Sequence, residues 1–263
     1  MDLGPDTETT ADGFLGKRLV ALQPKKGFRA GSDTLFLAAA VPAAPGERVL
    51  ELGIGAGVAS LALAARVEGL AITGLEIEPV LGRLAEANFS RNRSAGAVSG
   101  TLEVIVGDVA VPPPGLGAGG FDHVFLNPPF FQSEAASAPA DAARATARHA
   151  PRGSLEAWIR LAAAAVRPGG SLTLIARAAA LPDLMRPMGA GPGAAGELGG
   201  LVLFPLWPGN GRPAKTALLQ AWRGSATPLR LSAGLALHDA AGAFTPAADA
   251  VLREAAGIDL GAE

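Results

Sequence analysis

The alternation of apolar runs with helix patterns constrains the fold of this 263-residue chain more than any other feature. Short runs rich in Val, Leu and Ile predict buried strands, and the stretches between them have the apolar spacing of helices. The predicted strands cover residues 48–52, 71–76, 102–106, 121–126, 170–175, 200–204 and 217–222. Such alternation predicts a parallel sheet with helices on both faces. The last two strands, joined by a Pro/Gly-rich loop, can pair antiparallel, so we expect a seven-stranded α/β sheet that is mostly parallel with a final antiparallel strand.

The remaining segments are assigned around this sheet. Residues 1–12 contain little that can be buried, and we expect them to be a disordered tail. Residues 13–263 are expected to form a single domain, with a lead-in over 13–45 and a C-terminal extension over 225–263. In the lead-in, Ser32 or Asp33 is expected to cap a helix.

Composition excludes several classes of protein. The chain has no cysteine and three histidines without metal-ligand spacing, so neither a disulfide nor a metal site is expected. The N-terminus is polar and acidic, unlike a signal peptide, and no apolar run approaches the roughly 20 residues of a membrane span. We therefore expect a cytoplasmic protein that does not enter a membrane. The net charge of −2 does not indicate a nucleic-acid partner, but basic residues cluster locally at Lys17, Arg18, Lys25, Lys26 and Arg29.

The tetrapeptide Asn127-Pro128-Pro129-Phe130 ends the predicted strand 121–126. Proline lacks an amide hydrogen and forces the preceding residue into an extended conformation. The segment offers a side-chain amide, stiff backbone carbonyls and a flat apolar ring at the sheet edge where α/β proteins bind ligands. Carbonyl oxygens accept the hydrogens of a planar amine, and the ring stacks on the group that carries it.

A glycine-rich turn follows the first strand of the predicted sheet. Gly53, Gly55 and Gly57 allow a tight turn and a close approach of a ligand to the backbone, although their spacing differs from that of a dinucleotide-binding loop. Glu76 ends the next strand, where a carboxylate can accept both hydroxyls of a ribose. Glu78 is a rival for this role, and we prefer Glu76.

Three further positions complete the predicted edge. Asp108 ends the third strand and can accept a hydrogen from the amine of an adenine, whose faces Ile77 or Val109 can cover. Glu51 lies inside the first strand, where an unpaired carboxylate is costly, so its side chain is expected to reach the glycine turn or a cationic amine of the ligand. All of these residues fall at one sheet edge, and they can therefore surround one ligand.

This order of motifs resembles the S-adenosylmethionine (SAM) methyltransferases that modify amino groups. The resemblance implies a class I, Rossmann-like methyltransferase fold. It implies that Asn127, Pro128, Pro129 and Phe130 hold the target amine. The residues that it assigns to SAM at the sheet edge are Glu51, Gly53, Gly55, Gly57, Glu76, Ile77, Asp108, Val109 and Asn127.

More narrowly, residues 23–33 resemble the segment that precedes the SAM domain in bacterial valine-tRNA adenine-N6 methyltransferases. There the segment packs over SAM, which implies that Arg29, Ser32 and Asp33 also contact the cofactor. This family modifies the adenine just 3′ of the anticodon, so the resemblance implies a tRNA substrate. Four other hypotheses about the function stay open: a protein glutamine N-methyltransferase, a guanine-N2 RNA methyltransferase, a nicotinamide oxidoreductase, and a non-catalytic SAM- or RNA-binding module.

Overall fold

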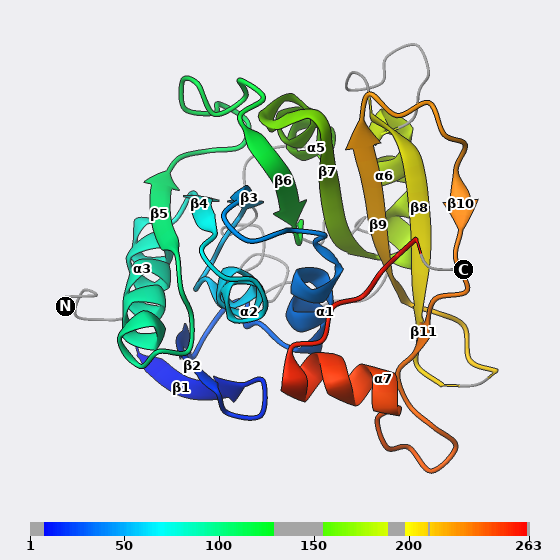
Figure 1. Ribbon diagram of the computed structural model, residues 1–263, viewed down its shortest axis with the longest axis horizontal. Helices are drawn as coiled ribbons and strands as arrows, with labels where there is room; N and C mark the ends of the chain where they lie inside the picture. The colour runs from blue at the N-terminus through cyan, green and yellow to red at the C-terminus, as the bar shows by residue number, and fades with distance from the viewer. Residues whose placement is uncertain (1–7, 129–154, 189–197, 210, 262–263) are drawn as a thin grey trace, which may run out of the picture.

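A nine-stranded sheet forms the centre of the computed structural model, which describes residues 8–128, 155–188, 198–209 and 211–261 (Figure 1). The strand order is β10-β8-β9-β7-β6-β3-β4-β5, and β11 also pairs with β8. The seven longer strands are β3 (Arg48–Leu52), β4 (Ala71–Glu76), β5 (Thr101–Val106), β6 (Phe121–Leu126), β7 (Val166–Arg177), β8 (Leu198–Trp207) and β9 (Thr216–Arg223). All seven were predicted. Two short strands, β10 (Arg230–Leu231) and β11 (Leu235–Ala236), extend the sheet beyond the predicted seven.

Strand direction agrees with the predicted α/β class. β9 runs antiparallel to β7 and β8, whereas the other pairs in this sheet are parallel. From β3 the chain moves outward through β4 and β5 and then returns to β6 on the other side of β3. Such a reversal opens a crevice at the carboxyl ends of the two central strands, which is where α/β sheets bind ligands.

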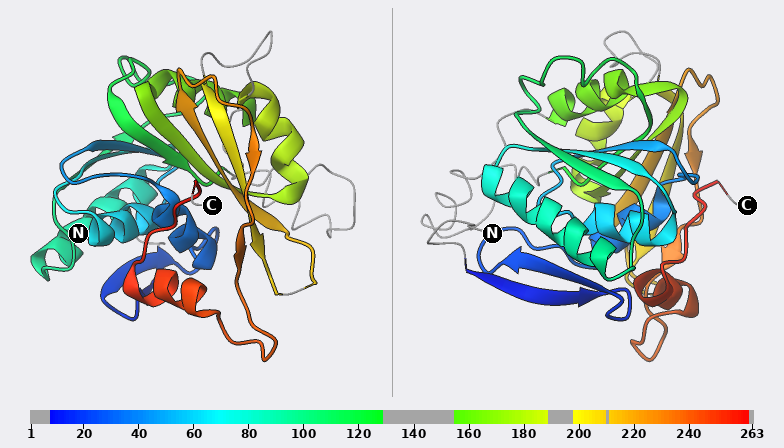
Figure 2. Two further views of the ribbon diagram at one scale, coloured as in Figure 1. Left: turned by 45° about the vertical axis from the view of Figure 1, so that its right-hand side comes forward. Right: turned by 60° about the vertical axis from the view of Figure 1, so that its left-hand side comes forward.

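Helices cover both faces of the sheet (Figure 2). One face carries α1 (Ser32–Ala40), α2 (Val58–Arg66) and α3 (Pro79–Ser94), and the other carries α5 (Leu155–Ala165) and α6 (Leu181–Met188). The short turn η1 (Ala178–Ala180) precedes α6. Near the C-terminus, α7 (Pro246–Asp249) continues into η2 (Ala250–Glu254), which packs on α1. No helix in the described residues is long and apolar enough to cross a bilayer.

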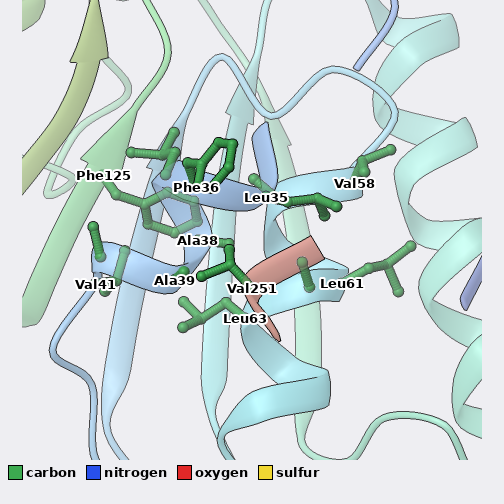
Figure 3. Close-up of a cluster of buried hydrophobic side chains, with 14 of the residues drawn as sticks. Leu35, Phe36, Ala38, Ala39, Val41, Val58, Leu61, Leu63, Phe125 and Val251 are labelled. Atoms are coloured by element: carbon green, nitrogen blue, oxygen red, sulfur yellow. The ribbon is translucent and has the colours of Figure 1, made fainter. Parts of the chain in front are cut away.

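Successive strand residues enter opposite halves of the core. Phe125 of β6 packs with the α1 and α2 side chains, whereas Val124 and Leu126 pack with α5. Figure 3 shows Phe125 beside Phe36 of α1 in the first of these clusters. Burial on both faces explains why the central strands are nearly continuous apolar runs, as is usual in parallel sheets.

The N-terminal segment corrects one prediction. Residues 9–12 were expected to be disordered, but they belong to β1 (Thr9–Phe14), which pairs antiparallel with β2 (Leu19–Pro24). Pairing gives β1 backbone hydrogen bonds to β2 along its whole length, and Asp12 accepts hydrogen bonds from the side chains of Gln23 and Arg29. Residues 9–24 therefore form a hairpin that spans the end of the predicted tail and the start of the lead-in, and its strand β2 packs beside α3 (Figure 1).

The predicted cap of α1 is also wrong. Gly31 is the N-cap residue, with an extended backbone and no side-chain hydrogen bond, and Ser32 is already helical. A capping side chain must come from the non-helical residue before the first turn, so neither Ser32 nor Asp33 can fill that position. Asp33 instead places its carboxylate in the first turn, where the helix dipole favours negative charge.

Candidate active site

Four parallel strands bring the predicted site residues to one edge. Leu52 at the end of β3 pairs with Leu126 of β6 on one side and Leu75 of β4 on the other, and β5 follows β4. Adjacent strands are about 4.8 Å apart, so three spacings separate β6 from β5 by about 14 Å. The residues that follow these strand ends can therefore contact one small ligand.

The glycine turn after β3 requires left-handed backbone at three positions. The φ angles are 70° at Gly53, 55° at Gly55 and 78° at Gly57, a region that side chains disfavour. The amides of Gly53 and Ile54 both donate to the carbonyl of Leu75, at 2.8 and 3.1 Å, which holds the turn against β4.

The three glycines differ in what surrounds them. A Cβ on Gly53 would lie 2.8 Å from Cη2 of Trp158, and a Cβ on Gly57 would lie 3.0 Å from Cβ of Ala85. A Cβ on Gly55 would meet nothing within 4 Å. The first and third glycines are thus needed for packing, whereas the second faces open space at the strand edge.

Glu76 is buried and supports the glycine turn. One carboxylate oxygen accepts the amide of Gly55 at 2.8 Å, and the other accepts the amide of Glu78 at 3.0 Å. Burial raises the pKa of Glu76, and these backbone hydrogen bonds oppose the rise. The amide of Ile77 is a third backbone donor to this carboxylate. A carboxylate has about four acceptor positions, so Glu76 keeps one for a hydroxyl of a ligand.

Glu51 reaches a partner that the sequence did not indicate. Its buried carboxylate accepts the amide of Ser60 at 3.2 Å and also the hydroxyl of Ser60. Because the N-cap residue Gly57 has no side chain, Glu51 supplies an acceptor for the first turn of α2. Burial raises the pKa of Glu51 to about 8, against the effect of the Ser60 hydrogen bonds.

The predicted adenine contacts lie at the end of β5. Asp108 accepts the amide of Ala110 at 2.8 Å, and it bridges to Val111, so part of its role is to form the turn. Val109 is buried in the cluster that includes α5, whereas Ile77 is half-buried beside Glu76. Their contacts with a ligand remain predictions.

Asn127 holds a buried acceptor without a partner. Within the described part of the chain, its Oδ1 atom is inaccessible to solvent and receives no hydrogen bond. Pro128 is buried directly after it, and Pro129 and Phe130 lie outside the described residues. A buried acceptor without a partner among the described residues requires a donor from elsewhere, and a ligand can supply it.

The predicted contacts in the lead-in are only partly brought to this edge. Arg29 donates to Asp12 at 2.6 Å and to the oxygens of Pro24 and Thr10, both at 2.9 Å, so its guanidinium is engaged within the hairpin rather than at the strand ends. Ser32 is exposed. Burial raises the pKa of Asp33, and the charge of Arg177 at the end of β7 opposes the rise.

Two buried asparagines of α3 were not predicted from the sequence. Asn92 pairs with the amide and carbonyl of Val20, at 3.1 and 2.8 Å, and Asn88 pairs with those of Leu22, at 2.8 and 2.9 Å. Asn88 also donates to the carbonyl of Ala56 in the glycine turn at 2.9 Å. Their spacing of four residues on an otherwise apolar face was the available signal.

The fold and this edge define a class of proteins. A mostly parallel sheet, a glycine turn after β3, acids at the ends of β4 and β5, and an Asn-Pro at the end of β6 together form the binding edge of a class I SAM-dependent methyltransferase. No group of three or more potential metal ligands lies together in the described residues.

Comparisons with known proteins identify the family. The sequence model of the methyltransferase small domain family matches residues 26–186. A tRNA1(Val) (adenine(37)-N6)-methyltransferase from Porphyromonas gingivalis is 31% identical over 185 residues, covering 66% of this chain and 68% of the relative. The enzyme of the same name from Mannheimia succiniciproducens is 30% identical over 182 residues, covering 69% of this chain and 72% of the relative.

A solved structure agrees with this result. A protein from Agrobacterium tumefaciens, described as a predicted O-methyltransferase, has a TM-score of 0.70 and 28% identity, covering 88% of this chain and 100% of its own. The chain belongs to the methyltransferase small domain family. It is a SAM-dependent methyltransferase, as the order of its motifs predicted.

The residues at the strand edge fit SAM. The space beside Gly55 admits a ligand against the backbone, and Glu76 keeps an acceptor position there beyond those used by the amides of Gly55, Ile77 and Glu78. At the neighbouring strand end lies the buried Oδ1 of Asn127, which has no partner in the part of the chain that the structure describes. A cofactor held along β3 and β4 would therefore lie beside Asn127 on β6.

Proposed function

We propose that this methyltransferase modifies the exocyclic N6 amine of an adenine in tRNA, next to the anticodon. The observation that carries the proposal is the buried Oδ1 of Asn127, which has no partner among the described residues, because an amine hydrogen of the target base would satisfy it. The names of the relatives from P. gingivalis and M. succiniciproducens support adenine as the base and tRNA as the substrate.

The residues proposed to hold SAM are those at the ends of β3, β4 and β5. They are Glu51, Gly53, Gly55, Gly57, Glu76, Ile77, Asp108 and Val109, with Asp33 at the start of α1. Glu51 acts by capping α2 behind the glycine turn. When bound, SAM supplies an electrophilic methyl group on a sulfonium.

Asn127 then prepares the acceptor amine. Its Oδ1 atom accepts one amine hydrogen and the carbonyl of Pro128 accepts the other, which leaves the nitrogen lone pair free to react. Both oxygens stabilise the positive charge that develops on the nitrogen, a role equivalent to that of an oxyanion hole with the charge reversed. An amide is not a base, so the surplus proton of the amine passes to water. Pro129 and Phe130 are proposed to complete the pocket, with the ring stacking on an extruded base.

The substrate class is tested by incubating the protein with tritiated SAM and either total RNA or a protein extract. We expect label in the tRNA fraction, as N6-methyladenine after digestion. Label in protein would favour the glutamine enzyme, and label in guanine would favour the guanine-N2 enzyme.

The role of Asn127 is tested by Asn127→Ala. We expect SAM affinity in calorimetry to be unchanged and kcat to fall by about 10²-fold or more, the scale seen when one charge-stabilising group is removed. Near-normal turnover in this variant would remove Asn127 from the reaction.

A further inference from the structure

The loop between β2 and α1 displays an aromatic ring among cations. Phe28 is 67% exposed, the most exposed phenylalanine among the described residues. Lys25, Lys26 and Arg29 beside it are also exposed. The ion pair from Lys25 to Glu8, at 3.3 Å, lies in solvent and contributes little, so a phosphate can replace Glu8.

This loop is anchored at its base rather than loosely attached. The buried side chain of Gln23 accepts the amide of Ala30 at 2.7 Å and donates to Asp12 at 2.7 Å. Arg29 donates to the same carboxylate and to the carbonyl of Pro24. The contacts of Gln23 and Arg29 close the loop, and Phe28 projects from its tip.

The loop leads directly to the edge that carries the site. It ends at Ser32, where α1 begins, and Asp33 lies within the electrostatic reach of Arg177. Arg177 ends β7, which runs parallel to β6, so it lies on the same edge as Asn127. A substrate seated at Asn127 is therefore within reach of this loop.

We propose that Phe28 stacks on an unpaired base that neighbours the target nucleotide, while Lys25 and Lys26 contact the adjacent phosphates. The inference rests on the proposed function, in which the substrate is RNA. Aromatic stacking beside cations is a common way to hold single-stranded nucleic acid, because every base has a stacking face and every phosphate a charge.

The test compares Phe28→Ala, Phe28→Trp and the control Leu231→Ala, whose side chain is 66% exposed on β10. Methylation of an unmodified valine-tRNA transcript and binding of the labelled transcript are measured, with SAM affinity by calorimetry. We expect Phe28→Ala to raise the KM and Kd for the transcript on the order of 10-fold. Phe28→Trp should restore both, Leu231→Ala should change neither, and SAM affinity should stay within about twofold.

Unchanged transcript binding in Phe28→Ala would overturn the inference, and so would a loss confined to SAM affinity, which would place Phe28 over the cofactor. Failure of the wild-type protein to bind the transcript would reject both this inference and the RNA substrate. Methylation of the transcript by the wild-type protein, with no effect of Phe28→Ala, would reject the loop contact alone.

A second inference rests on different contacts, those of Asn88 and Asn92. The two side-chain amides bond alternate residues of β2 as a neighbouring strand would, and both asparagines are buried. Asn88 alone also reaches the glycine turn, where its second amide hydrogen binds the carbonyl of Ala56. We infer that Asn88 is a positioning residue that couples the hairpin to the conformation of the SAM-binding turn.

The matched variants are Asn88→Ala and Asn92→Ala. Each variant removes two hydrogen bonds to β2. Asn88→Ala should therefore increase hydrogen exchange at the amide of Leu22, and Asn92→Ala at the amide of Val20. Only Asn88→Ala should weaken SAM binding in calorimetry, by about 10-fold. Asn88→Asp, which keeps the acceptor for Leu22 but cannot donate to Ala56, should weaken it similarly. Equal SAM affinities in Asn88→Ala, Asn88→Asp and Asn92→Ala would refute the coupling.

Discussion

Replacing Gly55 with alanine is expected to weaken cofactor binding strongly while largely preserving the fold. The new Cβ would meet no atom of the protein within 4 Å, so packing is not disturbed. The backbone at φ 55° remains left-handed, which costs a residue with a side chain about 1–2 kcal/mol. In a chain of this length, each kcal/mol lowers Tm by roughly 2–4 °C, so Tm should fall by about 2–8 °C.

Gly53→Ala is the matched control, because it has the same backbone requirement but no free space. Its Cβ would lie 2.8 Å from Cη2 of the buried Trp158 ring. Overpacking adds about 1–3 kcal/mol to the backbone term, for a total of about 2–5 kcal/mol. Gly53→Ala should therefore be clearly less stable than Gly55→Ala.

Thermal unfolding without ligand and calorimetry with SAM separate the two effects. We expect Gly55→Ala to be the more stable variant and yet to bind SAM at least 10-fold more weakly than the wild-type protein. Wild-type affinity in Gly55→Ala would show that the open space does not belong to the cofactor. A larger fall in Tm for Gly55→Ala than for Gly53→Ala would refute the packing argument.

Two further predictions concern the buried carboxylates. Glu76→Ala should weaken SAM binding in calorimetry by about 10-fold or more, because it removes the proposed ribose acceptor and leaves the amide of Gly55 unpaired; unchanged affinity would refute the ribose role. For Glu51, the pKa of about 8 in the folded state lies above that of the unfolded chain, so its contribution to stability is complete below pH 4.5 and is lost as pH rises through 8. Denaturant unfolding measures the free energy of unfolding of the wild-type protein and of Glu51→Gln. Between pH 5 and 8, this free energy should fall in the wild-type protein, relative to the variant, by up to about 1.4 kcal/mol per pH unit. The same pH dependence in both proteins would contradict the prediction.

Local patterns in the amino-acid sequence were enough to predict the strands of the sheet and the residues at its carboxyl edge. Apolar runs of five or six residues, glycines after Leu52 and a Pro-Pro pair after Asn127 act locally, through side-chain burial and allowed backbone angles. Because the strands are parallel, their carboxyl ends lie at the same edge of the sheet, whatever the detailed packing of the side chains. For this reason the α/β class and the edge position of Glu76 and Asn127 could be predicted from the chain alone.

The partner of each polar side chain depends instead on how separate elements pack in the folded protein. Glu51 binds Ser60, Arg29 binds Asp12, and Asn88 joins the hairpin to the glycine turn. Residues 9–12 likewise form part of a strand because they pair with β2, which follows after a short turn. Such pairings depend on the positions of side chains from separate elements. A hydrogen bond requires the donor–acceptor distance to be correct to within a few tenths of an ångström, and the donor hydrogen to point at the acceptor. Periodicity along a chain specifies which face is buried, but it does not specify which atoms meet there.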